Sequence, residues 1–298
     1  GHEVRVLARH PERLADRTWV DRVEVVAGDA DDPETVRRAL DGMDVAYYLL
    51  HSLQEGPQLE VAERGIATVF ADAARGSGLR RLVYLGGLAP QIDESAMSAH
   101  MRSRVEVGSV LRSSGVPTAE FRAAVIIGSG SASFEMLRYL TERLPAMITP
   151  RWVRSQTQPI AIRDVLRYLV GAVDLPPDVS RTFDIGGPDV LTYQEMMRRY
   201  AAVAGLRPRI ILPINLLTPN LSSHWVNVVT PVPRAIARPL VQSLRHPSIC
   251  HEHDIARWIP DPPGGLISFD EAVRLALTRI QDAKVATRWS GASVPGAP

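Results

Sequence analysis

The sequence contains one lysine, Lys284, among 34 basic residues, and one cysteine, Cys250. Chemistry that needs a lysine in the body of the chain is therefore excluded, which removes the Walker phosphate loop, Schiff-base catalysis and pyridoxal-phosphate attachment. A single cysteine cannot form a disulfide within the chain, and this scarcity fits a reducing compartment. The arginine-for-lysine bias itself is typical of genomic composition rather than of a particular chemistry.

Excess charge of one sign and long apolar runs are missing as well. The 34 basic and 33 acidic side chains leave a formal charge of +1, which argues against a nucleic-acid partner. No run of about 20 apolar residues occurs, so we expect no membrane-spanning helix, and without a secretory signal we expect a cytoplasmic protein. With 298 residues, 45% of them hydrophobic, the chain is long enough for one large or two ordinary domains.

The first half alternates short apolar runs with amphipathic segments. Apolar runs separated by helices predict a parallel sheet that is covered on both faces, a doubly wound α/β fold. The helix that starts near Asp31 carries Pro33 at its first position, where the missing N–H is harmless. The expected strands cover 3–8, 23–28, 45–50, 81–85 and 120–127, and the other expected helices cover 58–75 and 97–112.

The second half is less regular, and we divide the chain into an α/β domain at 1–130 and a smaller, mainly helical region at 131–286. Within that region, 181–187 is expected to return to the sheet. Residues 287–298 are expected to be a disordered tail. Helices are predicted after Ser131 and over 163–173, and two more begin with the capping pairs Thr192/Glu195 and Ser268/Glu271.

Residues 210–233 carry no formal charge and contain four prolines, so they cannot form one helix. We interpret them as loops and short helices over a pocket, in which His224 and Trp225 either border the substrate or anchor the packing. Peripheral contact of this stretch with a membrane surface or a partner is the alternative.

A dinucleotide-binding fold normally opens with a strand, a Gly-x-Gly-x-x-Gly turn and a helix, and no such turn occurs here. Residues 1–13 read like the segment that follows this unit. We therefore expect a preceding strand–turn–helix of about thirty residues and a gap in the middle of the sheet; an irregular sheet that begins here is the alternative. Gly128-Ser129-Gly130 lacks the third glycine, and we interpret it as a strand-to-helix turn capped by Ser131 or Ser133.

Four segments carry a resemblance in their order and spacing: GHEVRVLARHPERL, VVAGDADDPETVRRALDGMDVAYYL, RRLVYLGGLA and FRAAVIIGSG. They resemble the short-chain dehydrogenase/reductase superfamily, and most closely its atypical extended members, the NmrA-like proteins and the nucleotide-binding accessory subunit of respiratory complex I. RTFDIGGPDVLTYQEMM resembles a late strand and helix of extended members. The resemblance implies that 1–130 is a Rossmann-like domain that binds NAD(P) and that 131–286 is a substrate region.

The resemblance assigns cofactor-binding roles. Arg9 follows the second strand of the family's sheet, where an acidic residue would bind the ribose of NAD, so an arginine favours the 2′-phosphate of NADP over NAD, the alternative cofactor. Arg13 would assist one helical turn later, although both could simply be solvated arginines. The other implied cofactor-binding residues are Asp29 and Ala30 at the adenine, Leu49, Leu50 and His51 along the groove, and Gly86, Gly87, Ala123 and Val125 at the nicotinamide.

Active members of this superfamily use a serine and a Tyr-x-x-x-Lys pair, in which the ammonium lowers the pKa of the phenol. In this sequence a glycine, within Gly86-Gly87, stands at the serine position, and His100 and Arg104 stand at the tyrosine and lysine positions. An arginine holds its proton and binds hydroxyls or a phosphate. His100 either relays a proton to a carbonyl oxygen or lines the site without chemistry.

Two further groups of polar residues are interpreted as structural rather than as catalytic or metal-binding. Cys250-His251-Glu252-His253-Asp254 resembles a metal cluster in composition, but in a strand its side chains alternate between faces, so we expect a polar surface strand and no metal. Asp164 matches an acidic position of extended members and is interpreted as a helix cap.

Two functions remain open. One is an NADP(H)-dependent oxidoreductase that reduces a small apolar carbonyl or quinone by hydride transfer without the Ser-Tyr-Lys triad. The other is a non-catalytic NAD(P)-binding redox sensor or assembly factor, whose partner would be a regulatory protein. Epimerase or lyase chemistry on a sugar nucleotide is a third, minor alternative.

Overall fold

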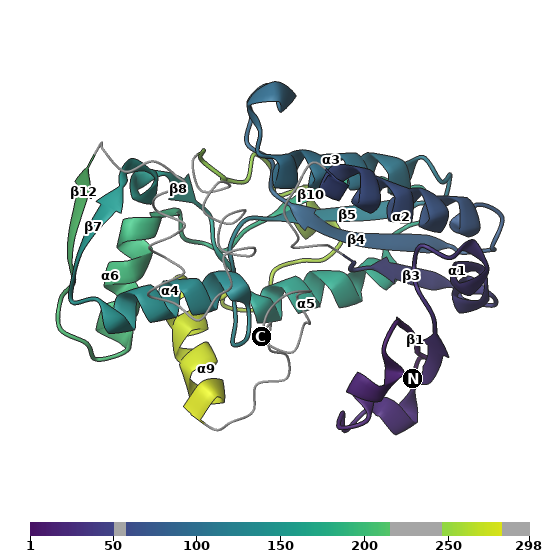
Figure 1. Ribbon diagram of the computed structural model, residues 1–298, viewed down its shortest axis with the longest axis horizontal. Coiled ribbons are helices and arrows are strands. Elements are labelled where there is room, and N and C mark those ends of the chain that lie inside the picture. The colour runs from purple at the N-terminus through teal and green to yellow at the C-terminus, as the bar shows by residue number, and fades with distance from the viewer. Residues whose placement is uncertain (51–57, 215–245, 282–298) are drawn as a thin grey trace.

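The computed structural model describes residues 1–50, 58–214 and 246–281. At its centre lies a sheet of four parallel strands in the order β10-β5-β4-β3 (Figure 1). Its strands are β3 (Val45–Tyr48), β4 (Arg81–Gly87), β5 (Thr118–Ala123) and β10 (Arg181–Ile185). After the second half has begun, the chain thus comes back to the sheet through β10.

Helices cover both faces of this sheet, as the apolar runs predict. One face packs against α1 (Pro33–Leu40), α2 (Gln58–Ala74) and α3 (Ala99–Arg112), and the opposite face packs against α5 (Ile162–Gly171). Alternation along β4 divides its side chains, because Leu82 and Tyr84 join the first layer while Val83 joins the second. The doubly wound α/β fold is therefore confirmed.

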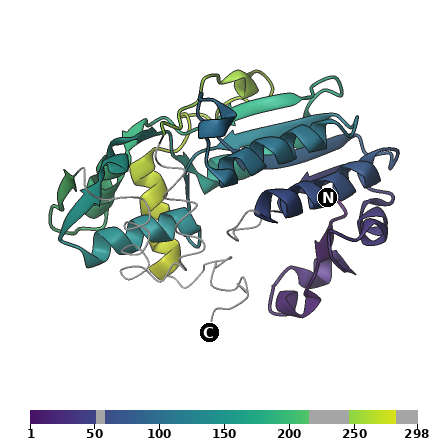
Figure 2. The same cartoon turned by 45° about the horizontal axis from the view of Figure 1, so that its top comes forward.

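Two further parallel strands, β1 (Arg5–Ala8) and β2 (Glu24–Ala27), form a separate two-stranded sheet. It lies apart from the four-stranded sheet in both views (Figures 1 and 2). In the described part of the chain, β1 pairs only with β2 and β3 pairs only with β4, so the gap that the sequence predicts is present. The Arg5 side chain holds the small sheet to α1 by donating to the carbonyl oxygens of Arg38, Ala39 and Asp41.

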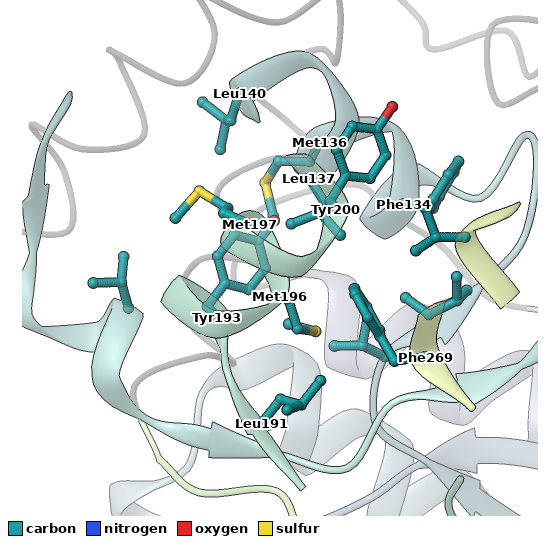
Figure 3. Close-up of a cluster of buried hydrophobic side chains, with 14 of the residues drawn as sticks. Phe134, Met136, Leu137, Leu140, Leu191, Tyr193, Met196, Met197, Tyr200 and Phe269 are labelled. Carbon is teal, nitrogen blue, oxygen red and sulfur yellow. The ribbon is translucent and has the colours of Figure 1, made fainter. Parts of the chain in front are cut away.

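The C-terminal half forms a second core around α4 (Ala132–Arg143), α6 (Tyr193–Val203) and α9 (Phe269–Gln281). Figure 3 shows aromatic and methionine side chains from α4 and α6 packed together, with Phe269 of α9 beside them. Three two-stranded sheets border this core, namely β6 (Ile126–Ile127) with β9 (Ile160–Ala161), β7 (Ala146–Pro150) with β12 (Ile210–Ile214), and β8 (Gln156–Thr157) with β11 (Leu191–Thr192).

The predicted helix starts are present. Asp32 caps α1 by accepting from the N–H groups of Glu34 and Thr35. Thr192 and Glu195 form the complete capping box of α6. Ser131 accepts from the N–H of Phe134 at the start of α4, so the turn after β6 is the strand-to-helix connection that the sequence indicates.

Three interpretations of the sequence were wrong. Residues 250–254 form no strand; Glu252 instead accepts from the N–H groups of Asp184 and Asp254, which fixes the segment beside β10. Asp164 caps no helix: α5 begins after Ala161, and the Asp164 carboxylate accepts from the N–H of Ile267. The run expected at 120–127 is two strands, because the chain leaves the sheet after β5 and pairs β6 with β9.

Several predictions lie outside the described residues: His51, His224 and Trp225, most of 210–233, and the tail at 287–298. Within the described ranges, no helix is long and apolar enough to cross a membrane. The same ranges contain no group of three or more His, Cys, Asp or Glu side chains that could hold a metal ion.

Candidate functional site

The candidate site residues follow the carboxyl ends of strands, the edge at which open parallel sheets bind ligands. Arg9 follows β1 and Asp29 lies shortly after β2, while Leu49 and Leu50 follow β3. In the central sheet the register pairs Gly87, the last residue of β4, with Ala123, the last residue of β5, and the N–H of Leu88 donates to the Ala123 carbonyl at 2.9 Å. The residues therefore form two groups, one on each sheet.

The first group joins Arg9 to Asp29. The Arg9 Nη1 lies 3.5 Å from Asp29 Oδ2, and the arginine side chain is 70% exposed. Arg13 lies in the exposed 3-10 turn Pro11–Leu14, and Ala30 is buried next to Asp29. An exposed guanidinium with one long ion-pair contact is available to a second anion.

Leu49 and Leu50 are 50% and 43% exposed, although they directly follow the buried Tyr48. Large apolar side chains that stay exposed at a ligand-binding edge offer packing surface to a flat ring. Among the described residues, no hydrogen bond or ion pair connects either leucine to Arg9.

The second group forms where α3 crosses the end of β4. A Cβ on Gly87 would lie 3.4 Å from the Met101 Sδ and 3.7 Å from the Arg104 Cγ, and a Cβ on Gly86 would lie 3.0 Å from the Tyr84 ring. The structure therefore brings Gly87 and Arg104 together, as the family resemblance implies. The two glycines let α3 and Tyr84 approach the backbone closely.

Arg104 is only 8% exposed, and its side chain lies between α3 and the end of β4. The Tyr84 hydroxyl donates to the Arg104 carbonyl at 3.3 Å, and the Arg104 side chain also bonds this hydroxyl. Burial raises the pKa of Tyr84, and the Arg104 guanidinium partly offsets that rise. A cation beside a phenol is thus retained, but between α3 and β4 and away from solvent.

A buried carboxylate, which the sequence did not single out, completes this polar layer. Glu63 of α2 is 5% exposed and accepts from the hydroxyl of Ser103 on α3. Burial, followed by the charges of Tyr84 and Glu63, raises the pKa of Tyr48. No motif spacing reveals Glu63, because α2 and α3 come together only in the tertiary structure.

His100 lies in the first turn of α3 and is partly buried. It precedes Arg104 by four residues, so both occupy one face of the helix. Ala123 and Val125 are buried, at 5% and 8% exposure, and the Val125 carbonyl accepts from the N–H of Ile160. Both residues are therefore buried below the carboxyl edge of the sheet and are not exposed at that edge.

These residues fit part of a dinucleotide. The exposed arginine and leucines suit a phosphate and a flat ring, and the side-chain-free Gly86-Gly87 gives backbone access at the edge. The sequence supplies no Gly-x-Gly-x-x-Gly turn for a pyrophosphate. The residues therefore fit the adenosine end of a dinucleotide and a group bound at the sheet edge beside β4.

Comparison with known proteins agrees with this geometry. A family model described as NAD(P)H-binding matches residues 1–120, and no curated protein matches the sequence. Among solved structures, the triphenylmethane reductase of Citrobacter sp. in complex with NADP(H) aligns with a TM-score of 0.68 at 17% identity, over 91% of this chain and 90% of that one.

Sugar-nucleotide enzymes have the same architecture. A nucleoside-diphosphate-sugar epimerase of Staphylococcus aureus aligns with a TM-score of 0.69 at 16% identity, over 91% of this chain and 90% of that one. UDP-glucuronic acid 4-epimerase of Bacillus cereus, in complex with NAD, gives 0.64 at 11% identity, over 92% and 84% of the two chains. The chain thus has the Rossmann-like α/β fold of these structures, and its residues 1–120 match a family model described as NAD(P)H-binding.

Proposed function

We propose that this protein is an NADP(H)-dependent reductase that transfers a hydride to a small apolar carbonyl compound or quinone without the Ser-Tyr-Lys triad. The observation that carries the proposal is the exposed Arg9 guanidinium at the carboxyl end of β1, within the residues that match the NAD(P)H-binding family model. At this position an arginine pairs with the 2′-phosphate that distinguishes NADP from NAD.

Asp29 competes with a cofactor phosphate for the Arg9 guanidinium. The carboxylate of Asp29 faces the same guanidinium at 3.5 Å. A bound 2′-phosphate would take this guanidinium as its partner and would also be repelled by the carboxylate. The two residues therefore act in opposite directions on NADPH and leave NADH almost unaffected.

Bound NADPH supplies the hydride. The described residues around Gly87 provide little acid to accompany the hydride, since a glycine within Gly86-Gly87 stands at the serine position and Arg104 holds its proton. His100 lies one helical turn before Arg104 on this face of α3, and we assign its imidazole as the proton donor to the acceptor oxygen. Quinones and conjugated ketones suit such a site, because they need less acid assistance than simple ketones.

The Arg9 proposal is tested by calorimetric titration of NADPH and NADH into the wild type, Arg9→Gln and Asp29→Asn. We expect Arg9→Gln to weaken NADPH binding about tenfold, the value of one charge-assisted contact, and to leave NADH binding unchanged. Asp29→Asn should strengthen NADPH binding. Equal affinities of the wild type for both cofactors would contradict the proposal.

The absence of the triad favours one other function, a non-catalytic NAD(P)-binding sensor. NADPH oxidation, followed at 340 nm against a panel of quinones and aromatic ketones, separates the two. Turnover that falls in His100→Phe supports the reductase and the assigned proton donor. Firm NADPH binding with no acceptor reduced would identify the sensor instead.

A further inference from the structure

The C-terminal half buries polar side-chain atoms that have no hydrogen-bond partner among the residues that the structure describes. They are Thr149 Oγ1, Trp152 Nε1, Thr157 Oγ1 and the Tyr193 hydroxyl, and we refer to these four residues as the unpartnered set. Their side chains are at least 91% buried. Buried polar groups are nearly always paired in native proteins, so four partnerless atoms in one part of a fold need an explanation.

The unpartnered set surrounds the beginning of α6. Tyr193 is the first residue of that helix, and Thr157 lies opposite Leu191 in the β8–β11 pair just before it. Trp152 belongs to the 3-10 helix Arg151–Arg154, which packs against α6, and its ring meets the Tyr193 ring edge-on with centroids 5.5 Å apart. Thr149 precedes this short helix at the end of β7.

The surroundings of the set are apolar and rich in aromatic and sulfur-containing side chains. Figure 3 shows the Tyr193 ring beside Met197, within the cluster that α4, α6 and α9 build. Burial keeps the pKa of Tyr193 raised, so its hydroxyl stays protonated and able to donate. The four groups supply an indole donor and three hydroxyls without a formal charge. Such a lining suits a neutral, flat molecule that carries an oxygen acceptor.

The set also lies close to the ligand-binding edge. Three residues after Thr157, the N–H of Ile160 donates to the carbonyl of Val125, just beyond the end of β5. Three residues of extended chain span at most about 11 Å. A molecule held by Thr157 is thus within reach of the carboxyl end of the central sheet.

From these observations we propose that the unpartnered set forms the binding site for a neutral aromatic carbonyl compound, whose oxygen supplies the missing hydrogen-bond partner. This inference deepens the proposed function, because such a compound is the acceptor class of the proposed reductase. Its test needs no cofactor, so the two can fail separately.

The experiment compares two tyrosines of α6. Within residues 1–50, 58–214 and 246–281 the Tyr193 hydroxyl has no hydrogen-bond partner, whereas the Tyr200 hydroxyl donates to Glu142 at 2.6 Å. Without ligand, Tyr193→Phe removes an unsatisfied hydroxyl and should raise the Tm by roughly 2 °C. Tyr200→Phe removes a satisfied one and should lower the Tm. These opposite shifts establish that the first hydroxyl lacks a partner in the free protein.

Binding is then measured by calorimetry with 2-acetylnaphthalene, a neutral aromatic ketone, and with 2-ethylnaphthalene, which has the same shape without the oxygen. The wild type should bind the ketone about fivefold more tightly, the worth of one hydrogen bond. Tyr193→Phe should reduce that preference, and Tyr200→Phe should keep it. No ketone binding, equal affinity for both compounds, or an unchanged preference in Tyr193→Phe would overturn the proposal. A lower Tm in Tyr193→Phe would do the same, because it would mean that ordered water already satisfies the hydroxyl.

Discussion

The two halves of the molecule treat buried polar groups differently. In the sheet layers, Glu120 is 1% exposed and lies between the guanidinium groups of Arg112 and Arg122, and the buried Glu63 accepts from Ser103. In the C-terminal half, the hydroxyl and indole groups of the unpartnered set are also buried, but they form no hydrogen bond within the described part of the chain. Across the stretches that the structure describes, the buried carboxylates of the first region are paired, although the Arg81 Nε on β4 is not, and the second region contains four unpartnered atoms.

This difference separates the roles of the two regions. Paired buried charges hold α2 and α3 against the sheet whether or not a ligand is present, so they stabilise the scaffold that positions Gly87 and Arg104. Partnerless hydroxyls destabilise the free protein and become favourable only when a ligand supplies the partner. We therefore expect the paired carboxylates to support the fold without a ligand, and the unpartnered set to gain its hydrogen bonds on binding.

The largest expected effect comes from Glu120→Gln. The amide keeps the shape but removes the charge between Arg112 and Arg122, so two partly buried guanidinium groups face each other. Breaking a buried ion pair in this way costs about 3–5 kcal/mol of the free energy of unfolding, which urea denaturation measures. The control Glu34→Gln removes a 68% exposed carboxylate that pairs with Arg37 on α1, and should change stability little.

A matched pair of hydroxyl deletions compares the two regions directly. Ser103→Ala removes the donor to the buried Glu63 carboxylate and should destabilise the protein by about 1–3 kcal/mol. Thr157→Val removes a partnerless hydroxyl with almost no change of shape and should leave the free energy of unfolding equal or higher. If both variants lost similar stability in denaturant titrations, the contrast between the regions would be wrong.

The smallest effect concerns the cap of α6. Hydrogen bonds from the backbone N–H and the hydroxyl of Thr192 hold the pKa of Glu195 below its ordinary value. The ionised carboxylate therefore stabilises the fold above a pH of about 4.3, and this contribution disappears as the pH falls through the lowered pKa. In Glu195→Gln, the Tm should depend less steeply on pH below about 5 than in the wild type. Parallel profiles of Tm against pH in the two proteins would mean that this cap does not contribute to the loss of stability in acid.

Much of the fold follows from local sequence patterns. Asp32-Pro33 starts α1, the Thr192/Glu195 box starts α6, and the apolar run that ends in Gly86-Gly87 is β4. The sequence also predicted the gap between β1 and β3. The segment at 250–254 was predicted wrongly because its alternating polar residues mimic a strand, whereas long-range bonds from Asp184 and Glu252 fix it.

The candidate site was predictable only in part. Arg9 and Asp29 were named from their positions after two strands, and the structure brings them within 3.5 Å of each other. Arg104 was named from its helix spacing, but its burial beside Tyr84 was not foreseen. Glu63 was missed, because a carboxylate on an amphipathic helix looks solvated until the neighbouring helix is placed.

By itself, the sequence determined the alternation of strands and helices in the first half, the capped starts of α1, α4 and α6, and the absence of a lysine that could serve the usual catalytic pair. These properties depend on residues that are close in the chain, and local backbone and side-chain preferences encode them. Only the tertiary structure decided which polar groups are satisfied. Whether Tyr84 or Tyr193 finds a partner depends on residues far away in the sequence that packing brings near, and no local pattern records that distance.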